Sequence, residues 1–374
     1  MAMRAPTLVV LLFLSFLAPG VLAHTAEAST PHHLLPSIDL NDPSLDPHKA
    51  TLDGSPADNL PPHIRQVLDR GMRPDWSPDG KSLVYLDGPL GDVWHLKLAT
   101  NKTRNLTGRL DHFGFLRAHH LPNGDLVLCG PDHPVDMSAE EPGRFEGKLW
   151  TLPKPYTGEI HPLGRPCWEG VAVSRRANRI AWNESDIDFT SPTVPLDALT
   201  KKSEIWMGDI VTENGVPRLA DVRLVATRQS TALIAPIEVQ DFRGPSEQEL
   251  IFTAYGYLTG EVMGYDLRTK STTNYSNSIY YEEAEGTSPD GSFVLVERDL
   301  MVNPIPGALD FWRLTLEKPR TWTRLTNFNR YRGYGASNPV VSPDGRSVAF
   351  QMSITEGAEG EGAGLFVLDL TQVS

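Results

Sequence analysis

The stretch Trp76-Ser77-Pro78-Asp79-Gly80 decides the fold, because its last four residues recur along the chain. Proline presets φ and glycine supplies positive φ, so Pro-Asp-Gly predicts a tight turn between two strands. The turn recurs as two identical copies, one variant and two degenerate copies, at Ser288–Gly291, Ser342–Gly345, Leu121–Gly124 and segments starting at Ser174 and Gly244. Six related turns indicate an internal repeat.

A second pattern has the same period. A charged or small residue, an apolar residue and a large residue recur as triplets that end at Trp94, Trp150, Trp206, Met263, Trp312 and Phe366. A short apolar stretch, typical of a buried strand, precedes each triplet, and a polar segment follows most of them. Four antiparallel strands in about 54 residues describe one blade of a β-propeller.

The fold class is therefore all-β, a six-bladed β-propeller of four-stranded antiparallel blades. The last copy reaches Leu370 and leaves no room for a fourth strand, whereas residues 65–68 precede the first copy and resemble the missing one. We expect this N-terminal strand to close the ring. Seven blades remain an alternative, with the extra blade between Ser174 and Gly244, although residues 183–201 read better as an inserted loop.

Over residues 64–374 these repeats resemble the TolB-like family of propellers with WD40-like repeats, whose Trp-Ser-Pro-Asp-Gly motif is present at Trp76–Gly80. The resemblance implies a TolB-like β-propeller. It does not select an activity, because propellers of this family include binding modules, peptidase-associated domains and carbohydrate-active enzymes.

The N-terminal region predicts export. Residues 1–23 read as a signal peptide, 24–62 as a proline-rich leader without a core of its own, and 63–374 as the propeller domain. Four Asn-x-Ser/Thr sequons predict glycosylation at Asn101, Asn105, Asn183 and Asn274. The two cysteines, Cys129 and Cys167, fall in adjacent blades and predict a disulfide. We expect a secreted, extracellular glycoprotein.

Charge and hydropathy limit the partners. The 374 residues include 34 basic and 47 acidic ones, for a net charge of −13, so we expect no nucleic-acid partner. No apolar run after residue 23 is long enough to span a bilayer, so we expect no membrane partner either. We expect a monomer with a glycan or small-molecule ligand at its central channel, and no cofactor.

Residues just before each turn are candidates to line that channel. Glu283 and Glu285 lie two apart on a predicted strand and share a face, which suits acid and base catalysis. The alternative is an acidic, solvated or salt-bridged mouth. His119 and His120 are consecutive and should point to opposite faces, so we predict no metal site.

The remaining candidates bind or assist. Arg73 and Arg117 are predicted to hold a substrate carboxylate, unless they pair with Glu169, Glu283 or Glu285. Glu169 and Asn338 are further substrate-binding candidates, and Tyr281 is a candidate proton donor. The patterns of serine hydrolases, zincins and nucleotide-binding loops are absent from the sequence.

These residues predict a carbohydrate-active enzyme, a lyase or a hydrolase acting on uronic-acid-containing glycans. In elimination, Arg73 or Arg117 neutralises the carboxylate, His119 removes the α-proton and Tyr281 protonates the leaving oxygen. In hydrolysis, Glu283 and Glu285 carry the catalytic roles. The alternatives are a non-catalytic glycan- or protein-binding propeller and a secreted tailoring or cyclising enzyme of small-molecule biosynthesis.

Overall fold

The computed structural model describes residues 52–135, 146–168, 171–186, 202–228, 236–255, 260–278, 280–299, 308–355 and 362–373. All of them belong to one unit, Ile38–Ser374. The predicted signal peptide, the first part of the leader and Glu169 lie outside the described residues.

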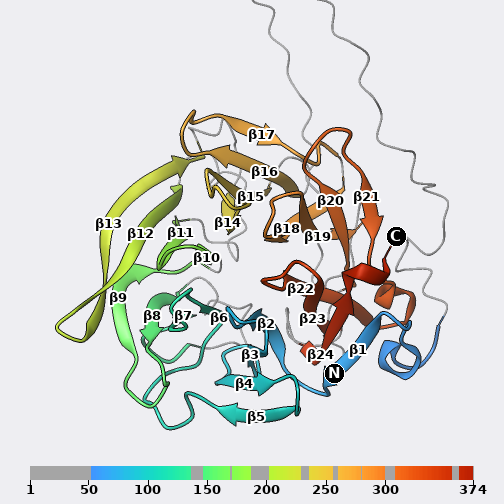
Figure 1. Cartoon of the computed structure of the whole chain (residues 1–374), viewed down its shortest axis with the longest axis horizontal. Coiled ribbons are helices and arrows are strands. Elements are labelled where there is room, and N and C mark those ends of the chain that lie inside the picture. The colour runs from blue at the N-terminus through green and yellow to red at the C-terminus, as the bar shows by residue number, and fades with distance from the viewer. Residues whose placement is uncertain are drawn as a thin grey trace, which may run out of the picture. The chain divides into compact units, whose positions relative to one another are not determined.

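Twenty-four strands form antiparallel sheets arranged in a ring (Figure 1). Blade 1 contains β2 (Met72–Trp76), β3 (Ser82–Leu86), β4 (Val93–Lys97) and β5 (Lys102–Asn105). Blade 2 contains β6 (Arg117–His120), β7 (Leu126–Gly130), β8 (Lys148–Leu152) and β9 (His161–Pro166). Blade 3 contains β10 (Val171–Val173), β11 (Arg179–Ser185), β12 (Ser203–Glu213) and β13 (Val216–Thr227).

The next two blades form one eight-stranded sheet, because β16 and β18 share a single parallel pair, Gly260 with Tyr281. Blade 4 contains β14 (Ile237–Phe242), β15 (Glu249–Tyr255), β16 (Gly260–Asp266) and β17 (Thr272–Asn274). Blade 5 contains β18 (Tyr281–Thr287), β19 (Phe293–Asp299), β20 (Asp310–Thr315) and β21 (Trp322–Arg324). Counting each half of this sheet as one blade gives six blades among the described residues.

Blade 6 joins the two ends of the chain. Its strands are β22 (Tyr334–Val341), β23 (Ser347–Ile354), β24 (Gly362–Asp369) and β1 (Ile64–Leu68). Strand β1 pairs antiparallel with β24, with Ile64 opposite Leu368 and Gln66 opposite Phe366. The predicted closure of the ring by an N-terminal strand is confirmed.

The sequence repeats map onto the blades as predicted. Each Pro-Asp-Gly-type turn follows an inner strand, and the large residue of every triplet lies in the third strand of its blade. The inner strands β2, β6, β10, β14, β18 and β22 lie around the centre in Figure 1. The predicted all-β propeller fold is confirmed.

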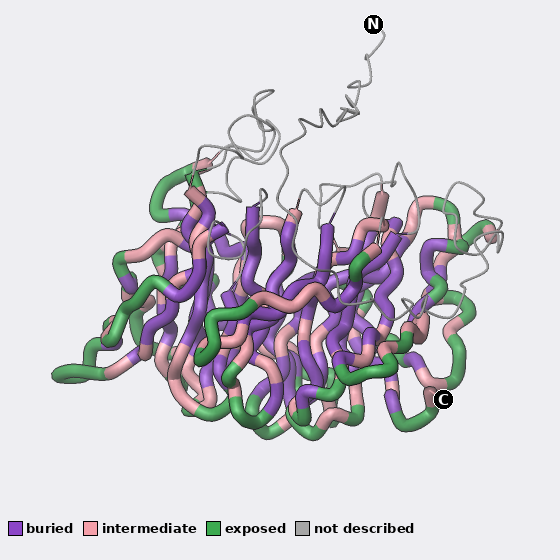
Figure 2. Tube along the Cα trace, turned by 90° about the horizontal axis from the view of Figure 1, so that it is seen from above, coloured by how far each residue is buried: buried purple, intermediate pink, exposed green. Residues whose placement is uncertain are grey.

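The core lies between blades. The buried apolar residues form six clusters, and each cluster draws its members from two neighbouring blades. Figure 2 shows the strands buried along most of their length and exposed residues concentrated at the turns. Because each blade buries its faces against its neighbours, the inner strands are held in fixed positions around the centre.

Part of the leader belongs to the folded unit. Leu52 pairs with Tyr331, the 3₁₀ helix η3 spans Pro56–Asn59, and Ala57 and Leu60 pack against the cluster shared by blades 5 and 6. Residues before position 63, where the sequence predicts the propeller to begin, thus also contact the propeller. The prolines of the leader favour extended backbone, but the side chains of Ala57 and Leu60 still pack against the propeller.

Blades 2 and 3 are linked covalently. Cys129 in β7 and Cys167 just before β10 form a disulfide with Cα atoms 5.8 Å apart, so the predicted pairing is confirmed. A disulfide is compatible with an oxidising compartment. Secretion itself stays a prediction.

One predicted glycosylation site is wrong. The Asn183 side chain is fully buried, and its amide oxygen accepts a hydrogen bond from the backbone N–H of Val239 at 2.6 Å. Asn183 therefore joins blade 3 to blade 4 and has no room for a glycan in the folded chain. Asn101 is exposed, and Asn105 and Asn274 are half-buried, so glycosylation at these three stays a prediction.

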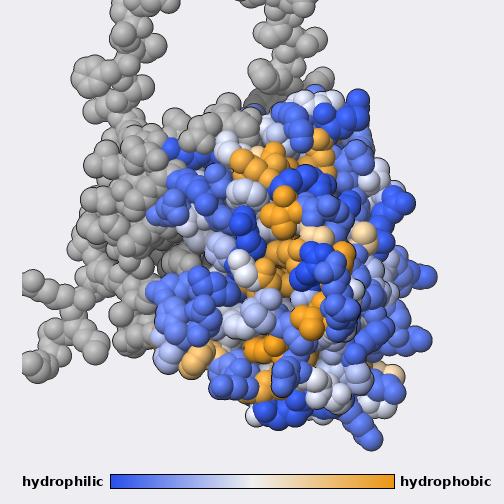
Figure 3. Space-filling model, turned by 90° about the vertical axis from the view of Figure 1, so that its left-hand side faces the viewer, coloured by the Kyte–Doolittle hydropathy of each residue, from blue (hydrophilic) through white to orange (hydrophobic). Residues whose placement is uncertain are grey.

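The long hairpin of β12 and β13 forms the outer side of blade 3. Val216, Val222 and Leu224 of β13 are exposed, and Figure 3 shows hydrophobic side chains in a band between charged ones on this side of the molecule. Separately, none of the helices in the described residues is long and apolar enough to cross a membrane.

Candidate functional site

A cavity of about 590 Å³ lies among the inner strands and the turns that follow them. All six blades contribute to its lining. Of the predicted site residues, Arg73, Arg117, His119, Glu285 and Asn338 line it. The structure thus brings together residues from blades 1, 2, 5 and 6 that are far apart in the sequence.

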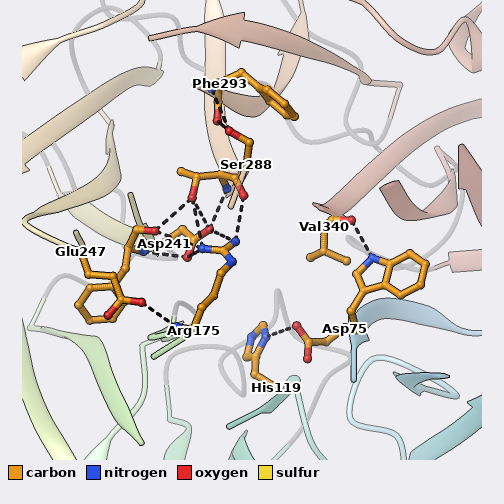
Figure 4. Close-up of polar contacts among 11 residues, drawn as sticks. Asp75, His119, Arg175, Asp241, Glu247, Ser288, Phe293 and Val340 are labelled. Carbon is orange, nitrogen blue, oxygen red and sulfur yellow. Dashed lines mark hydrogen bonds and ion pairs between the residues drawn. The ribbon is translucent and has the colours of Figure 1, made fainter. Parts of the chain in front are cut away.

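Asp75 organises the two histidines. Its Oδ1 lies 3.3 Å from Nδ1 of His119 (Figure 4). Its Oδ2 lies 3.1 Å from Nδ1 of His120. The two imidazoles differ in burial, as expected for consecutive strand residues, and yet both reach the Asp75 carboxylate on β2. The His119 side chain is 21% exposed and that of His120 only 3%, so His119 is the histidine open to the cavity.

The environment keeps Asp75 ionised. Burial alone would raise the pKa of Asp75, but the hydrogen bonds from His119 and His120 outweigh it and hold that pKa well below its usual range. An ionised Asp75 favours the His119 tautomer that carries its proton on Nδ1. The second ring nitrogen, Nε2, is then the basic one.

A matching network occupies blades 3 to 5. Arg175 donates to both oxygens of Asp241, at 3.2 and 2.8 Å, and to the backbone oxygen of Thr287 at 2.9 Å. Asp241 also accepts the backbone N–H of Thr287 at 2.8 Å. Glu247 accepts the backbone N–H of Arg175 at 2.8 Å, as Figure 4 shows. These charges are satisfied by protein groups.

A cluster of carboxyl groups lies around blades 4 and 5. The Tyr255 hydroxyl lies 2.7 Å from a carboxyl oxygen of Glu238 and 2.7 Å from one of Glu283. Tyr281 donates its own hydroxyl proton to the other oxygen of Glu283. Because the Tyr255 hydroxyl has one proton, two hydrogen bonds to carboxyl groups require a proton on one of those carboxyls.

Glu285 is the carboxyl group of this cluster that lines the cavity. Burial raises the pKa of Glu285 well above its usual range, and the nearby carboxylates of Glu297 and Glu283 raise it further, while Arg117 opposes them. Burial likewise raises the pKa of Glu297 to about 8. The raised pKa favours the protonated form of Glu285, which makes this side chain a candidate proton donor.

The predicted arginines are both held by protein groups. Arg117 donates to the side-chain oxygen of Asn338, and Arg73 donates to the backbone oxygen of Leu116 at 2.8 Å.

Burial raises the pKa of Tyr281 well above 10, with the Glu283 carboxylate adding to the shift. Tyr281 positions Glu283, which argues against its predicted role as the proton donor to substrate.

Sequence reasoning missed Asp75, Glu238, Glu297, Arg175 and Asp241 as site residues. For two of them a signal exists, because Asp75 and Asp241 each precede the aromatic residue that ends the inner strand, Trp76 in β2 and Phe242 in β14. An alignment of blades would have singled out the pair. Within the described residues, no group of three His, Cys, Asp or Glu side chains could hold a metal ion.

No protein-family model matches the chain, and no curated protein matches it by sequence. Among solved structures, a gluconolactonase from Xanthomonas campestris is 14% identical, with 85% of this chain and 98% of that chain covered and a TM-score of 0.50. An oligogalacturonate lyase from Vibrio parahaemolyticus is 11% identical, with 82% and 93% covered and a TM-score of 0.48. A TolB from Agrobacterium tumefaciens is 14% identical, with 77% and 72% covered and a TM-score of 0.37. At these identities the likeness concerns the fold alone.

Proposed function

We propose that the protein is a glycoside hydrolase that releases a uronic acid in its central cavity. One contrast supports this most strongly: the cavity is lined by Glu285, whose pKa burial raises, and by Asp75, whose pKa the hydrogen bonds from two histidines lower. Carboxyl groups whose environments push their pKa values apart are typical of glycosidase sites.

In the proposed reaction, Glu285 gives its proton to the glycosidic oxygen as the bond from that oxygen to the anomeric carbon breaks. A water molecule forms the new bond to the anomeric carbon and gives a proton to Nε2 of His119. Asp75 holds the His119 ring through Nδ1 and stabilises the imidazolium that results. The leaving group departs as an alcohol.

Arg117 accounts for the choice of a uronic acid. It lies on β6 two residues before His119, so the two side chains share a face of the strand. A guanidinium group is suited to bind a carboxylate with two parallel hydrogen bonds. A substrate carboxylate held there would lie beside the proposed base.

The same placement favours a second candidate, elimination. With the carboxylate neutralised by Arg117, His119 would take the proton from the carbon next to it, and Glu285 would protonate the oxygen that leaves. The bond from the leaving oxygen to the next ring carbon breaks, so a cleaved glycan would carry an unsaturated uronate in addition to a new reducing end.

The test is a panel of glucuronides and galacturonides of both anomers. Each reaction is assayed for new reducing ends and for the absorbance of an unsaturated uronate. We expect reducing ends with the natural chain and at least a hundredfold slower reaction with Glu285→Gln and with His119→Ala. Melting temperatures should change little.

The matched control is Glu213→Gln, an equally conservative change at an exposed glutamate on the outer hairpin, which should leave turnover unchanged. Reducing ends that appear together with the absorbance of an unsaturated uronate would replace hydrolysis with elimination. Saturable binding with neither product would make the protein a binding propeller, and full activity in both site variants would move the site elsewhere.

A further inference from the structure

The turn end of the cavity is apolar. Pro78, Pro122, Pro289 and Pro343 are the second residues of the turns in blades 1, 2, 5 and 6, and all four line the cavity, as does Pro245 in blade 4. Five of the six turns thus place a proline ring at this end of the cavity, and the turn of blade 3 contributes Ser174, Arg175 and Arg176 instead. A proline ring has no donor to offer a ligand.

Valines and one tryptophan continue this surface inward. Val173 in β10 and Val340 in β22 line the cavity and are only half-buried, so a ligand can reach them. Trp76 donates its indole N–H to the backbone oxygen of Val340 at 3.0 Å. Its polar atom is thereby used, and the part of the ring that meets the cavity is apolar.

The charged residues at this end are already occupied. Arg175 is bound by Asp241, Arg176 donates to the backbone oxygen of Pro245, and Glu247 accepts from Ser174 and from the Arg175 backbone. The polar groups proposed to act on substrate lie earlier in the inner strands. Arg117 precedes Pro122 by five residues, which corresponds to roughly 15 Å of extended chain.

We propose that this apolar collar, formed by Pro78, Pro122, Pro289, Pro343, Val173 and Val340, binds a hydrophobic aglycone, so that the substrate is a uronic acid glycoside of an apolar small molecule and not a polysaccharide. The inference rests on the proposed function. A bound uronic acid beside Arg117 and Glu285 directs its leaving group along the cavity toward the collar.

Two further observations favour this substrate class. Extended glycans are typically bound on aromatic platforms, whereas Trp76 is the one Phe, Tyr or Trp among the described lining residues. The volume of about 590 Å³ falls within the range of sites for single small molecules. A cavity with the apolar collar at one end and Arg117 and Glu285 at the other matches a ligand with one charged end.

The test measures binding of methyl, butyl, hexyl and octyl β-D-glucuronides to the Glu285→Gln variant by calorimetry. Each methylene that enters the collar should tighten binding by up to about fourfold. Val173→Thr and Val340→Thr place a hydroxyl in the same volume, and should weaken octyl glucuronide severalfold while leaving methyl glucuronide unchanged. Val216→Thr, on the exposed outer hairpin, is the matched control and should change neither.

The outcomes separate the two proposals. Equal affinity along the series, together with turnover of uronic-acid oligosaccharides by the natural chain, overturns the collar and leaves the proposed hydrolysis standing. Affinity that rises with chain length, without turnover of any uronide by the natural chain, supports the collar and overturns the hydrolysis. Equal affinity without any turnover overturns both.

Discussion

One carboxylate oxygen of Asp75 contacts His120 twice, accepting its backbone N–H at 2.8 Å and lying 3.1 Å from its imidazole Nδ1. The contact joins the inner strands of blades 1 and 2. Asp241 makes the equivalent contact with the backbone N–H of Thr287, between blades 4 and 5. Asp75 differs in that its second oxygen reaches His119, so it combines a structural contact with the positioning of a proposed base.

Replacing Asp75 with asparagine should separate these two roles. The amide offers one acceptor oxygen where the carboxylate offers two, so His119 loses the partner that fixes its tautomer. We expect turnover of the uronide found by screening to fall by on the order of 10²- to 10⁴-fold, with a modest loss of melting temperature. Steady-state kinetics and thermal unfolding of the same preparation measure both.

Asp241→Asn is the control for that experiment. It removes the same kind of blade contact where no histidine is involved, so it should cost comparable stability and far less turnover. Equal losses of turnover in the two variants would show that Asp75 acts only on the fold.

Glu297 should make stability depend on pH. Because burial raises the pKa of folded Glu297 to about 8, the folded chain keeps a proton that the unfolded chain releases above about pH 4.3. The stabilisation is fully present below that pH and is lost as the pH rises through about 8. Stability should therefore fall across this window.

Glu297→Gln should flatten the fall. The amide oxygen can still accept the backbone N–H of Asn338, as the carboxyl group does, but the side chain no longer ionises. We expect melting temperatures equal to those of the natural chain near pH 4.5 and higher by several degrees near pH 9. Parallel curves for the two proteins between these limits would contradict the assignment.

The sequence predicted the framework of the site because the framework follows local rules. A Pro-Asp-Gly turn fixes where an inner strand ends, and the repeat of that turn places Arg73, Arg117, His119 and Glu285 around one centre. The closing strand at residues 65–68 follows from counting the strands of each blade, and the Cys129–Cys167 disulfide follows from the placement of the two cysteines in adjacent blades.

The partners of these residues could not be predicted in the same way. Glu297 lies on a second strand, β19, and reaches the channel by accepting the backbone N–H of Asn338 in the next blade. Asn183 in β11 likewise accepts the backbone N–H of Val239 in the next blade. The sequon at Asn183 does not indicate this contact. Such contacts depend on the angle between blades and on register shifts within the inner strands, such as the one between Ala284 and Thr287.

Removing the disulfide should lower stability without changing the site. Both cysteines are fully buried and 38 residues apart, and in the chain-entropy model closing such a loop is worth about 4 kcal/mol. Cys129→Ala with Cys167→Ala should therefore unfold at a lower denaturant concentration. The natural chain unfolded in a reducing agent should move in the same direction, and unchanged midpoints in both cases would contradict the argument.

Removal of the closing strand should be far more damaging than removal of the leader before it. Ile64 and Val67 are buried, and each apolar side chain of this size contributes roughly 1.5 to 3 kcal/mol. A chain that begins at Asp69 loses both, together with the pairing to β24, and leaves an open sheet edge. A chain that begins at Pro62 keeps β1 and loses only the packing of residues such as Ala57 and Leu60.

We expect the chain that begins at Pro62 to melt a few degrees below the chain that begins at Leu52, and the chain that begins at Asp69 to melt far below both or to aggregate. A synthetic peptide covering residues 62–68, added to the shortest chain, should restore part of its melting temperature by filling the vacant position beside β24. The same peptide with Val67→Asp would place a charge in the cluster between blades 6 and 1 and should not. If the shortest chain melts with the other two, or if both peptides act alike, the ring is not held closed by β1.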